Sequence, residues 1–429
     1  MSAAVHRRGT ASNINGSDIL SVLSTVADNS SKAGQDISDK AATIKSELQQ
    51  RQSTQQTSTS SSVESAFSAI SSIFQNGVSD LAQAVEELLS QGLLTGSLLE
   101  LLNGYADFSL NSDSNNNPKS PATPIYPSKS SGDAPYSVDE ATLRAAIYIP
   151  ESFSYGANGK IPVILVPGTA VPAGVTYYFS FSKLGSAVNV DPVWVNIPKA
   201  SLGDVRVNAE YVAYAINYIS GISASSNVSV ISWSQGGLNT QWALKYWPST
   251  RTVVSDFIAV SPDFHGTVEA FLTCPGLPSV VCTPALAQQY YDSSFIETLR
   301  ADGGDSAYVP TTTLYSSFDE IVEPMSGTTT SSAFLQDARG VGVTNNWVQA
   351  ICAGQAAGGV YTHEGMLYNP LSWALAIDAI THDGPGDPSR LDLGQVCSQI
   401  LPPQLGLSDM LGTEGLLLIA VAEILAYSL

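Results

Sequence analysis

The chain has 429 residues, which is enough for one large domain and an extension. Hydrophobic residues make up 44% of it and charged residues only 13%, so the chain can bury a substantial core. The formal net charge is −20, which argues against binding to nucleic acid and against electrostatic docking on anionic membranes.

The first 110 residues are expected to form a helical extension. Apolar residues recur at helical spacing in residues 19–26, 67–74 and 81–89, within a region rich in Ser, Gln, Ala and Leu. Residues 49–62 form a Gln/Ser/Thr tract that is typical of a linker or a disordered segment. The extension is interpreted as a pro-region, a cap over a substrate entrance, an oligomerisation arm or an appendage without a catalytic role.

A second linker, residues 111–134, is crowded with Asn, Ser, Pro and Gly and separates this extension from a domain that spans residues 135–429. Short apolar strands are predicted in that domain at 161–166, 193–195, 228–231, 257–260 and 312–315. Helices such as 207–219 and 294–300 alternate with them. This alternation predicts an α/β fold, with a mostly parallel central sheet and helices on both faces. The apolar run 416–422 is too short to cross a bilayer and is predicted to be a helix packed on the fold.

The segment Ser232-Trp233-Ser234-Gln235-Gly236-Gly237 follows the strand 228–231 and precedes a helix-forming stretch, 238–246. Strand, tight turn and helix in this order present the nucleophilic serine of α/β-hydrolases, so Ser234 is the candidate nucleophile. The usual pattern is G-x-S-x-G, and Ser232 stands at its first small position. A Ser/Gly turn without a chemical role is the alternative interpretation.

A serine nucleophile needs a histidine base, and in this fold the chain order is serine, acid, histidine. The histidines are His6, His265, His363 and His382. The order excludes His6 and disfavours His265. We expect His363 to be the base, and His382, in a turn-rich loop, is the alternative.

The acid is expected at the carboxyl end of a strand, where reactive groups gather in such folds. Asp319 lies just past the strand 312–315 and is the preferred candidate. Glu320 and Glu323 compete with it by proximity, or belong to a solvated acidic turn.

An oxyanion formed in acyl transfer requires N–H donors placed in advance. The amide of Gln235 follows the nucleophile at the start of a helix, where the helix dipole favours negative charge. Thr169, in Val166-Pro167-Gly168-Thr169 after an earlier strand, offers a second N–H and a hydroxyl. Gln235 and Thr169 are therefore the predicted oxyanion hole.

Four cysteines and a composition rich in Ser, Thr, Gly and Asn are typical of a secreted protein. Of three possible connectivities we favour Cys274–Cys282 with Cys352–Cys397, because the first two are close in sequence. Residues 1–16 contain no apolar signal-peptide core, so we expect that a leader has been removed. No cysteine or histidine pattern has metal-ligand spacing, and no metal or cofactor is expected. Sequons that permit N-glycosylation begin at Asn15, Asn29 and Asn227.

The motifs SWSQGG, VPGT, SPDFHGT and TTTLYSSFDEIVEP, followed by His363, resemble the Candida antarctica lipase B-like family of fungal serine lipases and esterases. The likeness runs from about residue 135 to the carboxyl end. It implies an α/β-hydrolase fold, a Ser234–Asp319–His363 triad and an oxyanion hole at Thr169 and Gln235. It also implies that two further residues line the substrate pocket, Asp263 and Gln289.

The resemblance further implies one family disulfide at Cys352 and Cys397. Three features differ from the pattern of that family. The helical extension has no counterpart there, and the Cys274–Cys282 loop falls where the family carries its small lid. The sequence also ends at Leu429 without the last disulfide-bearing segment of the family.

The sequence therefore predicts a secreted serine lipase or carboxylesterase that acts through an acyl-enzyme on Ser234. Its expected substrates are triacylglycerols and related lipophilic esters at a lipid–water interface. One alternative is an acyltransferase or amidase on the same triad. Another is a non-catalytic surface-binding protein that retains the fold. Nothing in the sequence sets the oligomeric state.

Overall fold

The structure is a computed structural model that describes residues 16–28, 35–54, 60–78, 81–94, 109–224, 226–268 and 282–427. Within these ranges the centre of the molecule is a seven-stranded sheet in the order β1-β3-β2-β4-β5-β6-β7. Strand β1 pairs antiparallel with β3, and the other pairings in the sheet are parallel. The strands are β1 (Ile147–Tyr148), β2 (Ile161–Val166), β3 (Val190–Val195), β4 (Val228–Trp233), β5 (Val254–Val260), β6 (Thr311–Tyr315) and β7 (Val343–Trp347).

The five predicted strands are confirmed as β2 to β6, and the predicted α/β-hydrolase fold is confirmed with them. The two edge strands were not predicted. Strand β1 has only two residues, and β7 reads VTNNW, with polar residues where an apolar run is expected. Asn345 and Asn346 of β7 make side-chain hydrogen bonds to Leu335 and Thr313, which satisfy these polar groups inside the fold.

Alternate residues of each central strand face opposite layers of the molecule. In β2, Val163 and Leu165 join one core cluster, while Ile164 and Val166 join the other. The second cluster is covered by α7 (Glu140–Ala145), α9 (Val205–Ile222), α10 (Gln235–Tyr246) and α12 (Ser294–Arg300). The first is covered by α8 (Ala173–Tyr178), α14 (Pro370–Thr381), α16 (Leu407–Glu414) and α17 (Leu416–Tyr427). Shorter helices are α11 (Pro284–Gln288), α13 (Val348–Ile351) and α15 (Leu393–Cys397).

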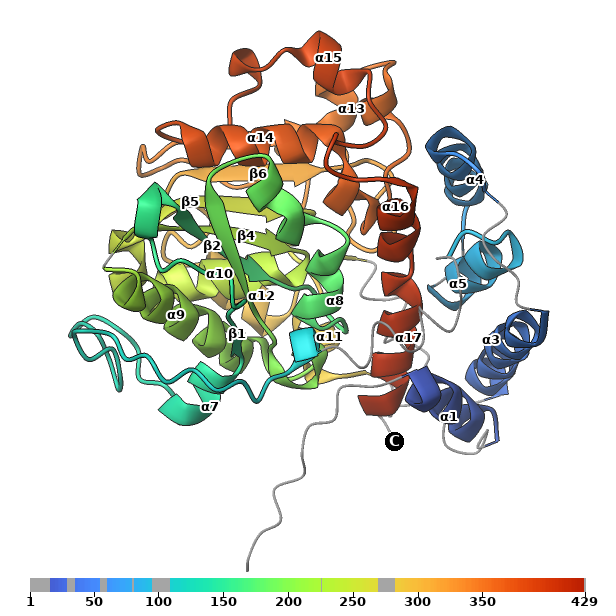
Figure 1. The fold of residues 1–429 in the computed structure, drawn as a ribbon, viewed down its shortest axis with the longest axis horizontal. Helices are drawn as coiled ribbons and strands as arrows, with labels where there is room; N and C mark the ends of the chain where they lie inside the picture. Colours follow the sequence, from blue (N-terminus) through green and yellow to red (C-terminus); the bar gives the residue numbers. More distant parts are fainter. Residues whose placement is uncertain are drawn as a thin grey trace, which may run out of the picture.

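The helices of the extension are α1 (Gly16–Ala27), α3 (Gln35–Thr54), α4 (Val63–Gln75) and α5 (Leu81–Ser90). They lie beside α16 and α17 on one side of the sheet, as Figure 1 shows in blue and red. Helices α1 and α5 contact α17, α4 contacts α16, and α3 packs on α1 and α5. Their buried residues, such as Leu23, Ile70 and Leu88, join the same core cluster as the residues of α17. The predicted Gln/Ser/Thr linker is shorter than expected, because α3 continues to Thr54.

Among the described residues one helical stretch, Leu407–Tyr427, is long and apolar enough to cross a membrane by length and composition. Of its most apolar window, 83% is buried inside the fold, which is the signature of a core helix. The prediction that residues 416–422 belong to a helix packed on the fold is confirmed, although the apolar stretch is longer than this run. The packing of the helix, rather than its length, identifies its role.

The segment expected to be a linker, 111–134, has no strand and only the end of a short 3-10 turn within it, and it is bonded to the hydrolase domain along its length. The Asn115 amide donates to the Ala145 carbonyl, and the Lys119 carbonyl accepts from the Tyr218 hydroxyl. As a domain boundary it stays a prediction.

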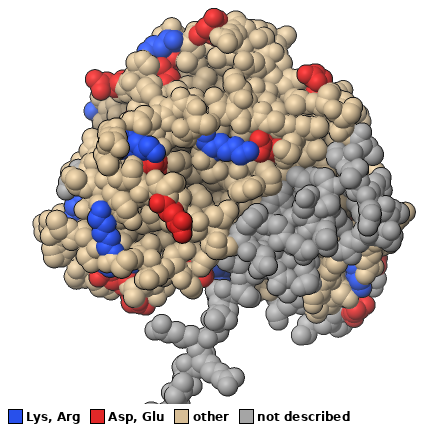
Figure 2. Space-filling model, viewed as in Figure 1, with Lys and Arg blue, Asp and Glu red and all other residues tan. Residues whose placement is uncertain are grey.

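The structure joins Cys352 and Cys397 in a disulfide, the pairing that the sequence favours. Cys282 is also disulfide-bonded. Its favoured partner, Cys274, lies outside the described residues, as do Asn15 and Asn29. On the face in Figure 2, charged side chains are scattered over a mostly uncharged surface.

Candidate active site

Ser234 lies on a sharp turn at the carboxyl end of β4, directly before α10. Its φ of 56° and ψ of −133° are a strained conformation for a residue with a side chain. Close packing holds this turn: a Cβ on Gly236 would lie 2.5 Å from the Val166 carbonyl oxygen, and one on Gly168 would lie 2.8 Å from Cβ of Ser234. Only glycine fits at these two positions, so the turn and the loop after β2 are locked together.

Asp319 and His363 are joined by a 2.8 Å hydrogen bond between Oδ2 and Nδ1. The other carboxylate oxygen, Oδ1, accepts the amides of Ile321 at 3.1 Å and Val322 at 2.8 Å. Both carboxyl oxygens of Asp319 are therefore in hydrogen bonds. With Asp319 as the acceptor, Nδ1 of His363 is the donor, and the lone pair is on Nε2.

The backbone of His363 is held from two sides. Its amide donates to Oε2 of Glu320 at 3.0 Å, and its carbonyl accepts from the Trp233 indole at 3.0 Å. The Trp233 ring also packs on the imidazole, with centroids 4.9 Å apart. The residue before Ser234 thus fixes the loop that carries His363, and Ser234 and His363 line one cavity.

Thr169 and Gln235 are the two residues predicted to form the oxyanion hole. Gln235 is the first residue of α10, so its amide has no partner inside the helix. The Thr169 hydroxyl donates to Oε1 of Gln289 at 3.0 Å, and Nε2 of Gln289 donates to the Ala285 carbonyl at 2.9 Å. The second bond fixes the amide of Gln289 so that its oxygen faces Thr169.

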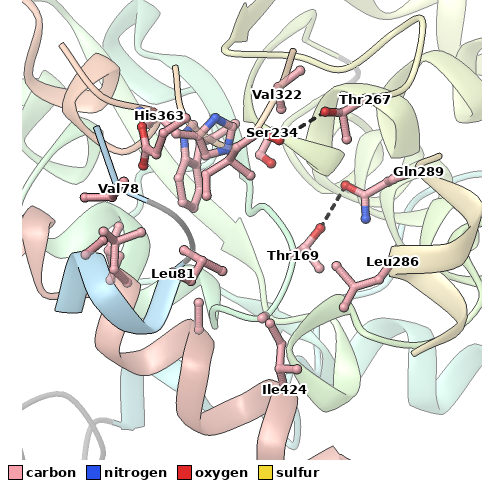
Figure 3. Close-up of a pocket in the computed structure, with 18 residues that line it drawn as sticks. Val78, Leu81, Thr169, Ser234, Thr267, Leu286, Gln289, Val322, His363 and Ile424 are labelled. Atoms are coloured by element: carbon pink, nitrogen blue, oxygen red, sulfur yellow. Dashed lines mark hydrogen bonds between the residues drawn. The ribbon is translucent and has the colours of Figure 1, made fainter. Parts of the chain in front are cut away.

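The cavity in front of Ser234 is mostly apolar, and Figure 3 shows its walls. Val78 and Leu81 enter from the extension, and Leu286 and Ile424 close the opposite side. The cavity has a volume of about 90 Å³. Further wall residues are Ala84, Ala170, Trp233, Thr267, Ile321, Val322, Leu416, Leu417 and Ala420.

Asp263 follows β5 and is fully buried, but it does not line this cavity. Neither of its carboxyl oxygens has a hydrogen-bond partner among the described residues. Burial raises the pKa of Asp263 to about 7, so the carboxyl is largely neutral in weak acid. Gln289, the other predicted pocket residue, does line the cavity.

The competing residues lie elsewhere or serve other contacts. His265 pairs with Asp305 at 2.9 Å, and His382 lines a separate groove at the amino ends of β4 and β5. Glu320 is not in a solvated turn: it lines the cavity, and burial raises its pKa well above the usual value. The carboxylate of Glu323 accepts the Met325 amide.

Sequence reasoning missed several residues that shape the site. Trp233 was quoted only as part of the turn, although its indole anchors His363. Leu81 was assigned only to an amphipathic stripe and Ala84 to no set of residues, and no local signal indicates that either reaches the cavity. Glu364 follows His363 directly and is fully buried.

The sheet order and the strand–turn–helix at Ser234 define the chain as an α/β-hydrolase. No protein-family model matches it. Lipase B of Pseudozyma antarctica is 33% identical over 261 residues, which cover 60% of this chain and 72% of that protein. The crystal structure of Aspergillus fumigatus lipase B is 62% identical and superposes with a TM-score of 0.90, over 95% of this chain and 96% of that one.

The chain therefore belongs to the lipase B family and is an ester-hydrolysing enzyme. The alignment to the Aspergillus structure covers so much of this chain that it includes most of the helical extension. The extension thus has a counterpart within the family.

Proposed function

We propose that the chain is a secreted serine lipase or carboxylesterase that hydrolyses lipophilic esters through an acyl-enzyme on Ser234. The observation that carries this proposal is the meeting of three features at one cavity. A strained Ser234, a His363 oriented by Asp319 and an apolar wall come together there. No cofactor or metal takes part in the proposed reaction.

In the first half-reaction, the Ser234 hydroxyl attacks the ester carbonyl while Nε2 of His363 takes its proton. The Asp319 carboxylate holds the Nδ1 proton and stabilises the imidazolium that forms. The oxyanion accepts from the Gln235 amide and from Thr169. The imidazolium then protonates the leaving alcohol.

In the second half-reaction, His363 activates a water molecule that attacks the acyl-enzyme, and Ser234 leaves with the returned proton. The Thr169 hydroxyl donates to Gln289 at rest. A rotation about one bond turns that proton toward the oxyanion, so the donor is engaged only when charge develops.

Ser234→Ala tests the proposal, and Ser232→Ala is its matched control. Ser232 is buried two residues away, and its hydroxyl has no hydrogen-bond partner among the described residues. We expect Ser234→Ala to lower kcat for p-nitrophenyl esters by about 10⁵-fold or more, since the residual rate comes only from binding and the oxyanion hole. Ordinary turnover by Ser234→Ala, or failure of a fluorophosphonate to label Ser234, would contradict the acyl-enzyme.

The substrate class and the compartment follow from different features. The apolar cavity wall favours the acyl chains of triacylglycerols and related esters. Disulfide-bonded Cys282, Cys352 and Cys397 favour secretion, because thiols stay reduced in the cytosol. Recovery of the enzyme from culture medium, compared with cell lysate, tests the second point.

We further propose that residues 1–110 form a cap on the catalytic domain, 135–429, joined through 111–134. The support is that Val78, Leu81 and Ala84 line the cavity. Cutting within 111–134 and removing the fragment is expected to change kcat/KM for long-chain esters more than for short ones. Equal changes for both would contradict a cap.

A further inference from the structure

Behind His363, away from the cavity, two glutamates that are distant in sequence meet inside the fold. Glu364 follows His363, and Glu414 is the last residue of α16. Both side chains are fully buried. The two carboxyl groups lie within hydrogen-bonding reach of each other, and each shifts the pKa of the other. Two ionised carboxylates at that range cannot form a hydrogen bond, since neither has a proton to donate.

Each carboxyl group uses its other oxygen to accept from a hydroxyl. Oε1 of Glu364 accepts from Thr362 at 2.9 Å, and Oε1 of Glu414 accepts from Tyr368 at 2.6 Å. The remaining oxygen of each group, Oε2, is buried and has no hydrogen-bond partner among the described residues. One proton between the two Oε2 atoms therefore completes the network.

We infer that Glu364 holds this proton and donates it to a Glu414 carboxylate, and that the pair is a positioning device that fastens the His363 loop to α16. The phenol of Tyr368 is a stronger donor than the alcohol of Thr362, so it favours the negative charge on Glu414. Burial, which raises the pKa of Glu414 to about 7, raises the pKa of Glu364 well above its usual value.

The surroundings of the pair contain little positive charge. Glu320, Asp319 and His363 face it from the side of the cavity, and Tyr361 and Tyr368 from the loop. The other acidic residue in α16, Asp409, is paired with Lys183. No nearby positive charge would therefore stabilise a second negative charge at the pair. Loss of the shared proton would make the two carboxylates repel each other.

The Glu364–Glu414 pair lies between the loop of His363 and the cavity wall. Leu416 and Leu417, immediately after Glu414, line the cavity, and His363 lies immediately before Glu364. The pair thus fixes the distance between the proposed base and one cavity wall. The predicted effect of the Glu364–Glu414 pair on activity rests on the proposed function of His363. The predicted location of the proton does not depend on that function.

The two isosteric amides distinguish this proton assignment from packing alone. In Glu364→Gln, the new NH₂ group donates to Glu414 and the oxygen still accepts from Thr362. We expect kcat within about twofold of wild type, and an alkaline limb of the pH–rate profile that extends to higher pH. Glu364→Ala removes the donor and is expected to lower kcat about tenfold through misplacement of His363, with a smaller change in KM.

Glu414→Gln places an NH₂ donor opposite another donor, because Glu364 and Tyr368 both need acceptors there. It is expected to lower kcat and thermal stability more than Glu364→Gln. Because it removes a negative charge near His363, it should also move the acid limb of the profile to lower pH by about half a unit. A packing role predicts equal behaviour of the two amides. That equality, or a Glu364→Gln variant as impaired as Glu364→Ala, would overturn the inference.

Infrared spectroscopy tests the proton without reference to catalysis. The C=O stretch of a protonated carboxyl group is expected in wild type at pH 8 and should be lost in Glu364→Gln. An unchanged band would reject the assignment even if the triad is correct. If the band is lost in Glu364→Gln but the kinetics of Glu364→Ala are unchanged, the proton assignment stands and the positioning role is rejected. If Glu414→Gln does not fold, the contrast between Glu364→Gln and Glu364→Ala still decides.

Discussion

Ser234 and Leu81 line the same cavity, yet they come from regions of the chain that are built by different physical rules. Around Ser234 the positions are set by hydrogen bonds, a strained backbone and glycines that no other residue can replace. Around Leu81 they are set by apolar burial, which is non-directional and tolerates exchange of one side chain for another. We expect chemistry to depend on the first region and substrate choice on the second.

The largest expected effect is in the hydrolase domain. Asp319→Asn keeps the shape of the acid but removes the charge that holds the Nδ1 proton on His363. We expect kcat to fall about 10⁴-fold with little change in KM, because the wrong tautomer is then favoured. Steady-state kinetics on a soluble ester measure this, with the exposed Asp302→Asn as control. A loss below tenfold would contradict the assignment of the acid.

The next effect concerns the oxyanion. Thr169→Val preserves the branched shape but removes the hydroxyl that now donates to Gln289. We expect kcat to fall about 10²-fold, the usual cost of one oxyanion donor. Thr298→Val, on the exposed side of α12, is the control. A change in KM alone would mean that the hydroxyl serves ground-state binding instead.

A smaller effect is expected from the extension, and it should depend on the substrate. Leu81→Ala enlarges the cavity, and Ala84→Phe fills it. We expect the ratio of kcat/KM for long over short esters to rise about fivefold in the first and to fall by a similar factor in the second. Ser90→Phe, at the exposed end of α5, is the control. Equal loss on all chain lengths would show that α5 supports the fold rather than selection.

The smallest effect is on stability in acid. Burial raises the pKa of Asp305, but hydrogen bonds from His265 and Arg300 outweigh it and bring the value to about 2. A lowered pKa in the folded state adds stability above pH ~4 that is lost as the pH falls toward 2. Asp305→Asn should therefore lower the melting temperature at pH 5, with the difference closing by pH 2. Apolar contacts of the extension do not titrate, so a gap that persists at pH 2 would contradict this origin.

The parts of the structure with local signals were predictable. The apolar runs predicted strands β2 to β6, and the strand–turn–helix pattern after β4 predicted the position of Ser234. Helix α3 extends through residues expected to be a linker because Gln and Arg are good helix formers, although their composition is that of a linker. Helix propensity and overall composition gave conflicting predictions for this segment, and helix propensity was the better guide.

The remaining features depend on contacts between distant segments. Glu364 and Glu414 are 50 residues apart, and no periodicity links them. Glu320 was considered as a competitor for the role of the acid or as part of a solvated acidic turn, and only the fold shows that it lines the cavity. The reach of Leu81 into the cavity likewise follows from how α5 docks on α17.

The close approaches at Gly168 and Gly236 have a consequence for how such an enzyme diversifies. They fuse the turn of Ser234 and the loop of Thr169 into one rigid part, which no wall helix contributes to. Helix α5, the wall element that the extension contributes, can therefore be varied without disturbing this part. For protein engineering, this means that the catalytic centre is best left unchanged. New substrate ranges are most accessible by grafting other helices onto the cavity wall.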